Sequence, residues 1–278
     1  MLSGPILVFD SGIGGLSVLA EIRKRLPAEN YCYLFDNARL PYGDLSESEL
    51  IRGCVELICQ QVQQVEAKIV VVACNTASTL VLPVLRQRLT IPVVGVVPAI
   101  KPAALLSKRK HIGVLATPGT VSRDYTHGLI SQFAEDCQVD LFGSSELVML
   151  AEQKAAKLPV NNQQLAKILA PIKASKLDVL VLGCTHFPMI KEELSQYLGE
   201  SVLLLDSGEA IANRVASLLE PAALSEALHS GTTLHGGANS GTKGIGVIHA
   251  AYTQAITAGL NITLQEYGIS DSSLIVTK

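Results

Sequence analysis

Two cysteines occupy matched positions in the sequence, each at the end of an apolar run. Cys74 ends the run in Val70–Thr76 (VVVACNT), and Cys184 ends the run in Leu180–His186 (LVLGCTH). Each run predicts a buried strand, and each cysteine precedes a segment with helical periodicity. A thiol at a helix N-terminus faces backbone N–H groups and the positive end of the helix dipole, which favour the thiolate. A single cysteine in such a place is more often only buried, but a matched pair favours a function.

Two equivalent thiols can invert a stereocentre without a cofactor. If they stand on opposite sides of an α-carbon, one thiolate removes the α-proton and the other thiol donates a proton to the opposite face. A thiol suits this exchange because its ordinary pKa, about 8.5, is close to the pH at which enzymes work. The α-proton of an amino acid is very weakly acidic, so such a site must exclude water and stabilise the carbanion electrostatically.

Polar residues near the two cysteines leave several interpretations open. Asp10 ends the first predicted strand, where it can cap the following helix, bind an ammonium group or poise Cys74. His186 is either a hydrogen-bonded polar residue at a strand end or a group that tunes Cys184. Cys184 and His186 alone would suit a hydrolase that forms an acyl intermediate.

Composition excludes several classes of protein. The chain has 278 residues, a net charge of −3, 48% hydrophobic and 17% charged residues, and a mean hydropathy of +0.35. These values exclude a disordered chain, and the length allows a sizeable core. The absence of a basic surplus and the aromatic content of 4% argue against nucleic-acid binding. No apolar stretch is as long as a membrane span, so we expect no membrane association.

The six cysteines form no pattern that is typical of a metal site. None belongs to a CxxC pair, and Cys54 and Cys59 have no second cluster, so we predict no metal. The N-terminus lacks the basic segment of a secretory signal. We therefore expect a cytoplasmic protein with free thiols. The cysteines outside the matched pair are predicted to be buried or incidental: Cys32, Cys54, Cys59 and Cys137.

Short apolar runs alternate with longer amphipathic segments along the chain. Strands are predicted over 6–9, 31–35, 69–73, 93–97, 112–115, 139–142, 179–182 and 202–205. Helices are predicted over 16–26, 46–65, 80–89, 121–133, 163–173, 189–198 and 209–219. In the tail we predict a loop over 230–243, a helix over 245–258 and a strand over 262–267. Ser46 and Glu49 have the spacing of a capping box.

This alternation predicts an α/β fold of two similar domains, each a mainly parallel sheet flanked by helices. Residues 6–12 and 112–118 resemble each other at nearly the same separation as the two cysteine segments. The chain is expected to cross between the domains at Pro98–Pro102 and to return at Asp206–Gly208. The predicted domains are residues 1–97 plus 207–278, and residues 98–206. Ligands of parallel sheets bind beyond the carboxyl ends of the strands, so the cleft between the domains is the expected site.

The segment Gly12–Ser17 (GIGGLS) nearly matches a dinucleotide-binding fingerprint, with Asp36 near the ribose-binding position. However, Ser17 replaces the third glycine, and the carboxylate of Asp10 would oppose a pyrophosphate. We interpret the segment as a tight strand-to-helix turn, whose helix N-terminus can bind a smaller anion such as a carboxylate. No Walker-type loop follows it, and we predict no cofactor.

Four short motifs occur in order along the chain. They are Asp10–Gly15 (DSGIGG), Pro41–Gly43 (PYG), Ala73–Ala77 (ACNTA) and Gly183–Pro188 (GCTHFP). Over roughly the first 220 residues, the sequence with these motifs resembles the bacterial glutamate racemases of the aspartate/glutamate racemase family. The resemblance implies two similar α/β domains with the active site in the cleft between them. It also implies an isomerase that interconverts L- and D-glutamate without a cofactor and supplies D-glutamate for peptidoglycan, and hence for cell-wall biogenesis and cell shape.

The resemblance also implies roles for individual residues. The implied catalytic residues are Cys74, Cys184, Asp10, His186 and Glu152. By resemblance, Asp10 assists Cys74, and His186 and Glu152 assist Cys184. The implied substrate contacts are Asp10, Ser11, Tyr42, Gly43, Asn75, Thr76, Thr117, Thr120, Thr185 and His186. Small hydroxyls, an amide and backbone N–H groups suit two carboxylates and an ammonium group.

Some of these roles have simpler alternatives. The segment Glu146–Lys157 is most simply a solvated helix face, so no sharp motif supports Glu152. Tyr42 is a hydroxyl donor on a loop near Asp36, where Pro41 and Gly43 alone would explain the turn. Some family members carry an N-terminal extension that binds a cell-wall precursor as an activator. Because this chain begins at its first strand, we expect it to lack that regulation.

Other functions remain open on the sequence alone. A related racemase, for example one that acts on aspartate, would use the same chemistry, since the depth of the pocket cannot be read from the sequence. A non-catalytic amino-acid-binding protein would keep both cysteines buried, and a Cys–His hydrolase would use Cys184 alone. We expect glutamate as the small-molecule partner and a homodimer as the default assembly.

Overall fold

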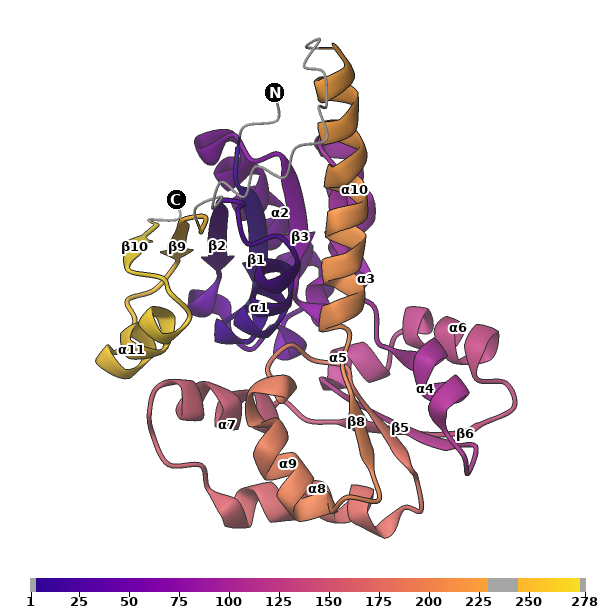
Figure 1. Cartoon of the computed structure of the whole chain (residues 1–278). Helices are drawn as coiled ribbons and strands as arrows, with labels where there is room; N and C mark the ends of the chain where they lie inside the picture. Colours follow the sequence, from indigo (N-terminus) through magenta and orange to yellow (C-terminus); the bar gives the residue numbers. More distant parts are fainter. Residues whose placement is uncertain (1–3, 230–244, 276–278) are drawn as a thin grey trace.

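The computed structural model of the chain describes residues 4–229 and 245–275 and contains two parallel β-sheets (Figure 1). The first sheet has the order β10-β9-β2-β1-β3-β4, and the second has the order β6-β5-β7-β8. The first comprises β1 (Ile6–Asp10), β2 (Tyr31–Phe35), β3 (Ile69–Val72), β4 (Val93–Gly95), β9 (Ile248–Tyr252) and β10 (Asp271–Leu274). The second comprises β5 (His111–Ala116), β6 (Gln138–Gly143), β7 (Val179–Leu182) and β8 (Leu203–Leu205). We call the parts that carry the two sheets the first half and the second half.

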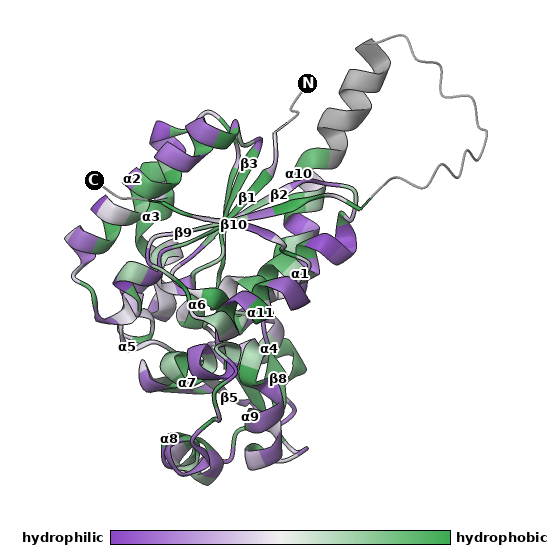
Figure 2. Cartoon of the chain, turned by 90° about the vertical axis from the view of Figure 1, so that its left-hand side faces the viewer, coloured by the Kyte–Doolittle hydropathy of each residue, from purple (hydrophilic) through white to green (hydrophobic). Residues whose placement is uncertain are grey.

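Helices cover both sheets, so the predicted fold class, two parallel sheets flanked by helices, is confirmed. In the first half, α2 and α3 lie on one face of the sheet and α1 and α10 on the other (Figure 2). The α-helices are α1 (Leu16–Arg25), α2 (Glu47–Val65), α3 (Asn75–Arg88), α4 (Ile100–Leu106), α5 (Pro118–Val121), α6 (Asp124–Phe133), α7 (Glu146–Ala155), α8 (Asn162–Ala174), α9 (Lys191–Leu198), α10 (Gly208–His229) and α11 (Ala258–Glu266). Short 3₁₀ helices are η1 (Ile13–Gly15), η2 (Asn37–Arg39), η3 (Tyr42–Asp44) and η4 (Phe187–Ile190). Within the described residues, no helix combines the length and apolar character that crossing a membrane requires.

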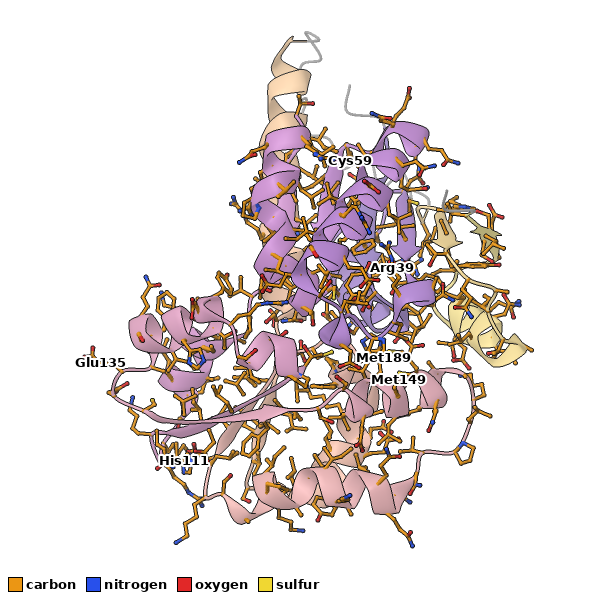
Figure 3. The ribbon with its side chains drawn as sticks, turned by 180° about the vertical axis from the view of Figure 1, so that it is seen from behind. Arg39, Cys59, His111, Glu135, Met149 and Met189 are labelled. Carbon is orange, nitrogen blue, oxygen red and sulfur yellow. The ribbon has the colours of Figure 1, made fainter. Side chains whose placement is uncertain are left out.

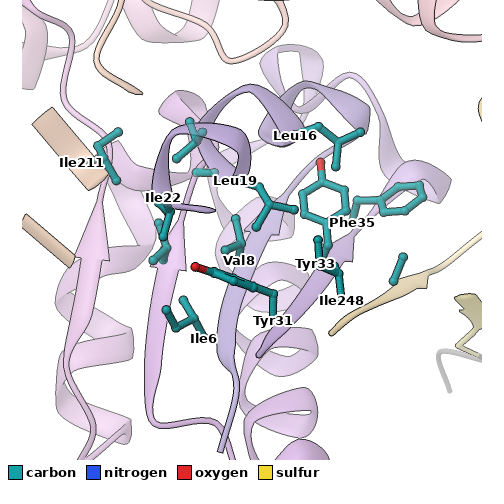
Figure 4. Close-up of a cluster of buried hydrophobic side chains, with 14 of the residues drawn as sticks. Ile6, Val8, Leu16, Leu19, Ile22, Tyr31, Tyr33, Phe35, Ile211 and Ile248 are labelled. Atoms are coloured by element: carbon teal, nitrogen blue, oxygen red, sulfur yellow. The ribbon is translucent and has the colours of Figure 1, made fainter. Parts of the chain in front are cut away.

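The continuous apolar runs form strands that are buried on both faces. In β1, Ile6 and Val8 pack toward α1 and α10, while Leu7 and Phe9 pack toward α2 and α3. Figure 4 shows the first of these clusters, in which Ile22 lies over the sheet. Because alternate side chains point to opposite faces of a strand, a strand covered on both sides must be apolar throughout. This burial anchors the strand ends that carry the polar residues discussed below.

The tail of the chain differs from our prediction. The predicted helix over 245–258 is wrong, because Ile248–Tyr252 forms β9, a strand paired with both β2 and β10. The predicted strand over 262–267 is also wrong, because Ala258–Glu266 forms α11, capped by the Thr257 hydroxyl, which accepts from Leu260 N. Pairing with β2 is a long-range contact that the local pattern does not contain. The predicted loop over 230–243 lies outside the described residues.

Smaller differences concern the bounds of helices and one edge strand. The helix predicted to start at residue 80 begins at Asn75. The helix predicted over 121–133 begins at Asp124 as α6, and Val121 instead ends the short helix α5. Strand β10 was not predicted, since its residues (DSSL) are polar and half-buried or exposed at the edge of the sheet. The predicted cap of α2 is confirmed, because the Ser46 hydroxyl accepts from Glu49 N.

The two halves are in contact at the ends of α7 and α11. The Thr263 hydroxyl donates to the carbonyl of Ala155 at 2.6 Å, and Lys157 forms an ion pair with Glu266 at 2.5 Å. Ala155 and Met189, which belong to the second half, pack against the core of the first. Figure 3 shows Met189 where the two halves meet. The structure therefore describes the halves closed on each other.

Candidate active site

Cys74 and Cys184 lie at the carboxyl ends of two inner strands, one in each half. Cys74 follows β3 after one residue and is the N-cap of α3. Cys184 follows β7 after one residue and precedes η4. The two residues expose only 4% and 6% of their surface. Both thiols are therefore shielded from water where the halves meet.

Burial raises the pKa of the Cys74 thiol well above its ordinary value, and the charge of Asp10 raises this pKa further. The N–H of Ala77 and the Ser11 hydroxyl oppose this shift, and the Ser11 contact spans 3.6 Å. Of these influences, the negative charge of Cys184 is the smallest, and it also raises the pKa of Cys74. At Cys74 the N–H of Ala77 at the helix N-terminus favours the thiolate, as expected, but burial and the charge of Asp10 outweigh this effect.

Asp10 connects the turn after β1 with both halves. It is fully buried, and its carboxylate accepts from the N–H groups of Gly12 at 3.3 Å and Gly15 at 2.9 Å. It also accepts from the Thr185 hydroxyl at 3.2 Å, across the junction of the halves. Burial raises the pKa of Asp10, although the positive charge of His186 and these hydrogen bonds oppose the shift. Asp10 thus holds the turn, as in the simpler alternative, and also acts on Cys74.

His186 links Cys184 to a carboxylate. Its Nδ1 lies 3.8 Å from Cys184 Sγ, and its Nε2 lies 2.7 Å from Glu152 Oε1. Burial lowers the pKa of His186, but the hydrogen bonds to Cys184 and Glu152 outweigh it and raise the pKa well above 6.5. A protonated imidazole can donate to both partners at once. The group is therefore a cation held against a buried thiol.

Glu152 does not belong to a solvated helix face. Its carboxylate is 11% exposed, and the neighbouring Leu150 and Ala151 are buried. Besides His186, Glu152 Oε1 accepts from the N–H of Ile13 in the first half at 2.8 Å. The simpler interpretation of this segment is wrong here, because the fold turns this face of α7 toward η1.

The glycines of the 12–15 turn make room for the His186–Glu152 pair. A Cβ at Gly12 would lie 2.2 Å from Glu152 Oε1, and one at Gly14 would lie 2.4 Å from His186 Nδ1. Both distances are far below a normal van der Waals contact, so neither position can carry a side chain without movement. The near-match to a dinucleotide fingerprint is thus explained by close packing within the chain.

Near Cys74, threonine hydroxyl groups from both halves contact one another. Thr76 Oγ1 lies 2.9 Å from Thr117 Oγ1 and 3.3 Å from Thr120 Oγ1. A Cβ at Gly43 would lie 2.8 Å from Thr117 Cβ, so the 41–43 turn lies against the same group. In the described part of the chain, Asn75 Nδ2 is buried without a hydrogen-bond partner. An unpaired buried donor is costly, so its position next to Cys74 is consistent with an anionic ligand there.

The sequence did not reveal how Tyr42 is held. Its hydroxyl donates to Asp36 Oδ2 at 2.5 Å, and Arg39 Nε lies 2.6 Å from the same oxygen. Asp36 Oδ1 accepts from the Thr253 hydroxyl at 2.7 Å. The Tyr42 side chain therefore anchors the turn through a buried carboxylate. The proximity of Asp36 and Tyr42 in the sequence was the one available signal, since Thr253 is distant along the chain.

Comparison with known proteins decides the family. The model of the Asp/Glu/hydantoin racemase family matches residues 6–215. The chain belongs to this racemase family. The glutamate racemase of Shewanella frigidimarina is 62% identical over 274 residues, covering 99% of this chain and 98% of that protein. The glutamate racemase of Shewanella woodyi is 59% identical over 273 residues, covering 98% of each.

Solved racemase structures have the same architecture. Escherichia coli glutamate racemase, in complex with L-glutamate and the activator UDP-MurNAc-Ala, has a TM-score of 0.83 and 42% identity, covering 99% of this chain and 100% of that one. Glutamate racemase RacE1 of Bacillus anthracis has a TM-score of 0.77 and 29% identity, covering 99% and 98%. The family resemblance and the expectation of an amino-acid isomerase are therefore confirmed. They favour a racemase over the amino-acid-binding protein and the Cys–His hydrolase.

Within the described residues of this racemase, no three His, Cys, Asp or Glu side chains are grouped so that they could hold a metal ion. The six cysteines are all free thiols. Of the predicted substrate contacts, the structure brings Ser11 against Cys74, and Thr185, the chain neighbour of Cys184, against Asp10. Tyr42 is the exception, since its hydroxyl is taken by Asp36.

The raised pKa of the buried His186 imidazole predicts that the free energy of unfolding depends on pH. Because the folded-state pKa of His186 is raised above 6.5, its bonds stabilise the fold fully below pH 6.5. This contribution is lost as the pH rises through the folded-state pKa. We therefore expect the wild type to have a larger unfolding free energy than His186→Asn. This difference should be largest below pH 6.5 and should shrink above it.

Urea denaturation of both proteins between pH 6 and pH 9 measures this difference. It should exceed about 0.5 kcal/mol at low pH, because substitutions at neutral surface positions usually change the unfolding free energy by no more than this amount. Glu152→Gln, which removes the partner charge, should flatten the same pH dependence. A difference that grows as the pH rises would contradict the assignment of a raised pKa to His186.

Proposed function

We propose that this chain interconverts L- and D-glutamate without a cofactor and that Cys74 and Cys184 are its two acid/base residues. The observation that carries the proposal is the placement of two buried thiols at inner strand ends, one in each half, with Ser11 against Cys74 and the neighbouring Asp10 bonded to Thr185, the residue after Cys184. The high identity to glutamate racemases supports glutamate as the substrate, in preference to aspartate. The roles follow from the surroundings of each thiol.

In each direction, one thiolate takes the α-proton and becomes a thiol, while the opposite thiol gives its proton to the other face of the α-carbon and becomes a thiolate. Protons therefore balance over one turnover, and the two cysteines have exchanged states. Exclusion of water strengthens the electrostatic stabilisation of the carbanion. The low exposure of both thiols supports such exclusion.

The two thiols have different partners. Burial raises the pKa of Cys74 most, and the charge of Asp10 raises it further, so the Cys74 thiolate is a stronger base. The protonated imidazole of His186, held by Glu152, lies where it stabilises a negative charge on Cys184. We therefore assign Asp10 as the assistant of Cys74, and His186 with Glu152 as the assistants of Cys184.

The substrate is expected to be held by polar groups from both halves. We propose contacts from Asp10, Ser11, Tyr42, Gly43, Asn75, Thr76, Thr117, Thr120, Thr185 and His186. For Tyr42 the contact would come from the backbone, because its hydroxyl is bonded to Asp36. The unpaired amide of Asn75 and the hydroxyls of Thr76 and Thr117 suit a carboxylate, which accepts several hydrogen bonds.

We further propose that residues 1–97 plus 207–278 and residues 98–206 act as two domains that close on the substrate. D-glutamate made in this way would supply peptidoglycan synthesis. Six free thiols fit a cytoplasmic enzyme. The homodimer stays a prediction.

The proposed reaction is tested with the purified wild-type chain and no added cofactor. L-glutamate, D-glutamate and both enantiomers of aspartate are each incubated separately, and optical rotation is followed. Both glutamate enantiomers should reach the same racemic end point, with aspartate turned over far more slowly. Lack of turnover of glutamate, or faster turnover of aspartate, would overturn the proposed substrate.

A further inference from the structure

Arg123 of the second half reaches across the junction of the halves to α3. It lies between α5 and α6, and its Nη1 donates to the carbonyl of Thr76 at 3.0 Å and to the hydroxyl of Thr79 at 2.6 Å. Its side chain is only 12% exposed, and its ion-pair partner Glu47, 3.5 Å from Nε, has a side chain that is 66% exposed. A guanidinium that is withdrawn from water for a carbonyl and a hydroxyl is costly, so its placement calls for a reason.

The reason lies in the contacts of the Thr76 side chain, since Arg123 binds the Thr76 carbonyl. The Thr76 hydroxyl contacts Thr117, the N-cap of α5, and Thr120 within α5, while Arg123, which follows α5, binds the Thr76 carbonyl. The segment 117–123 of the second half therefore contacts Thr76 of the first half at both its hydroxyl and its carbonyl. Gly119 of the same helix lies beside the Gly43 carbonyl, which a Cβ would approach to 3.3 Å.

We propose that Arg123 is a positioning residue that holds the two halves at the spacing at which hydroxyls from both can bind one substrate. This inference rests on the proposed function, because Thr76, Thr117 and Thr120 are its proposed substrate contacts. Arg123 touches neither thiol. It acts on substrate binding through Thr76, and in the absence of glutamate it keeps the cleft shut over the thiols.

Arg123→Ala should raise KM for glutamate about 10- to 100-fold with kcat changed less than about threefold. Loss of binding that is equal in the ground state and the transition state appears in KM alone, and loss of charge-assisted hydrogen bonds is of this size. Arg123→Lys should fall between, because an ammonium group keeps the charge but not the planar fork. Free guanidinium ion at millimolar concentration should partly restore KM in Arg123→Ala, with urea as the comparison.

A second readout does not depend on turnover. In the absence of glutamate, iodoacetamide should alkylate Cys74 and Cys184 at least about tenfold faster in Arg123→Ala than in the wild type, because an opened cleft exposes both thiols. Mass spectrometry of the peptides gives each rate. Cys59 on α2 is half-buried away from the junction, so its rate should stay the same in both proteins.

Matched variants separate this effect from a general loss of folding. Arg86→Ala removes an arginine of α3 that also donates to a backbone carbonyl, that of Val93, but within the first half, and it should leave KM and both alkylation rates unchanged. Thr79→Val removes one acceptor of Arg123, so the double variant Arg123→Ala/Thr79→Val should be no worse than Arg123→Ala.

The outcomes decide between the two proposals. Wild-type thiol rates in a folded Arg123→Ala variant, or a fall in kcat with unchanged KM, would overturn the role of Arg123. If Arg123→Ala does not fold, additive effects of Thr79→Val and Arg123→Lys would overturn it. Failure of the wild type to racemise glutamate would overturn the proposed function, while the alkylation rates would still decide on Arg123.

Discussion

Serine at either position of the thiol pair is expected to abolish most of the racemisation. In Cys74→Ser and in Cys184→Ser, kcat should fall about 10³-fold, because a positioned acid/base contributes about 10²- to 10⁴-fold. A hydroxyl is a far weaker acid than a thiol and leaves one face of the α-carbon without a proton donor or base. Because the two enantiomers have equal free energy, kcat/KM must fall by the same factor in both directions. Polarimetry with each enantiomer measures both values.

The other cysteines provide the comparison for this experiment. Cys59→Ser replaces a half-buried thiol on α2 and should retain wild-type kcat. Unchanged folding of all variants is checked by circular dichroism. Full activity in either Cys74→Ser or Cys184→Ser would refute a mechanism in which both thiols are required.

Alanine at Gly14 is expected to disable the second thiol indirectly. Its Cβ would lie 2.4 Å from Nδ1 and 2.6 Å from Cγ of His186, so the imidazole must move away from Cys184. Displacement of a catalytic group by about 1 Å can cost about 10²-fold in rate. Overpacking of a buried contact also costs about 1–3 kcal/mol of stability. We expect kcat to fall about 10²-fold, together with a lower melting temperature.

Gly128 on α6 is the matched control for this substitution. A Cβ at this position meets no atom within 4 Å. Gly128→Ala should keep kcat and gain up to about 1 kcal/mol, because alanine is the better helix former. Kinetics and thermal unfolding of both variants check the pair. A Gly14→Ala variant as active and as stable as Gly128→Ala would show that the imidazole is not held against the turn.

The inner strands and the places of the two thiols were predictable because their signal is local. The runs that end before Cys74 and Cys184 are apolar throughout, as strands buried on both faces must be, and such strands present polar residues at their carboxyl ends. The close packing of Gly14 against His186 was not predictable, since the two residues belong to different halves. The glycines alone signalled only a tight turn.

The features that the sequence did not predict depend on contacts between distant segments. Glu152 lies on a helix whose polar face resembles a solvated one, and only the docking of α7 against η1 turns it inward. Arg123 showed no motif at all, because its acceptors lie on α3 of the other half. Strand β9 resembled part of a helix until its pairing with β2 was known.

The most direct test of two-sided proton transfer is the isotope content of each enantiomer early in the reaction. The wild type is given L-glutamate in heavy water, and the reaction is stopped after a small conversion. The enantiomers are then separated, and mass spectrometry measures the deuterium content of each. If Cys74 and Cys184 act on opposite faces, the D-glutamate carries one deuterium at the α-carbon and the remaining L-glutamate carries none. D-glutamate that retains the original proton, or deuterium at the same level in both enantiomers from the start, would contradict the mechanism.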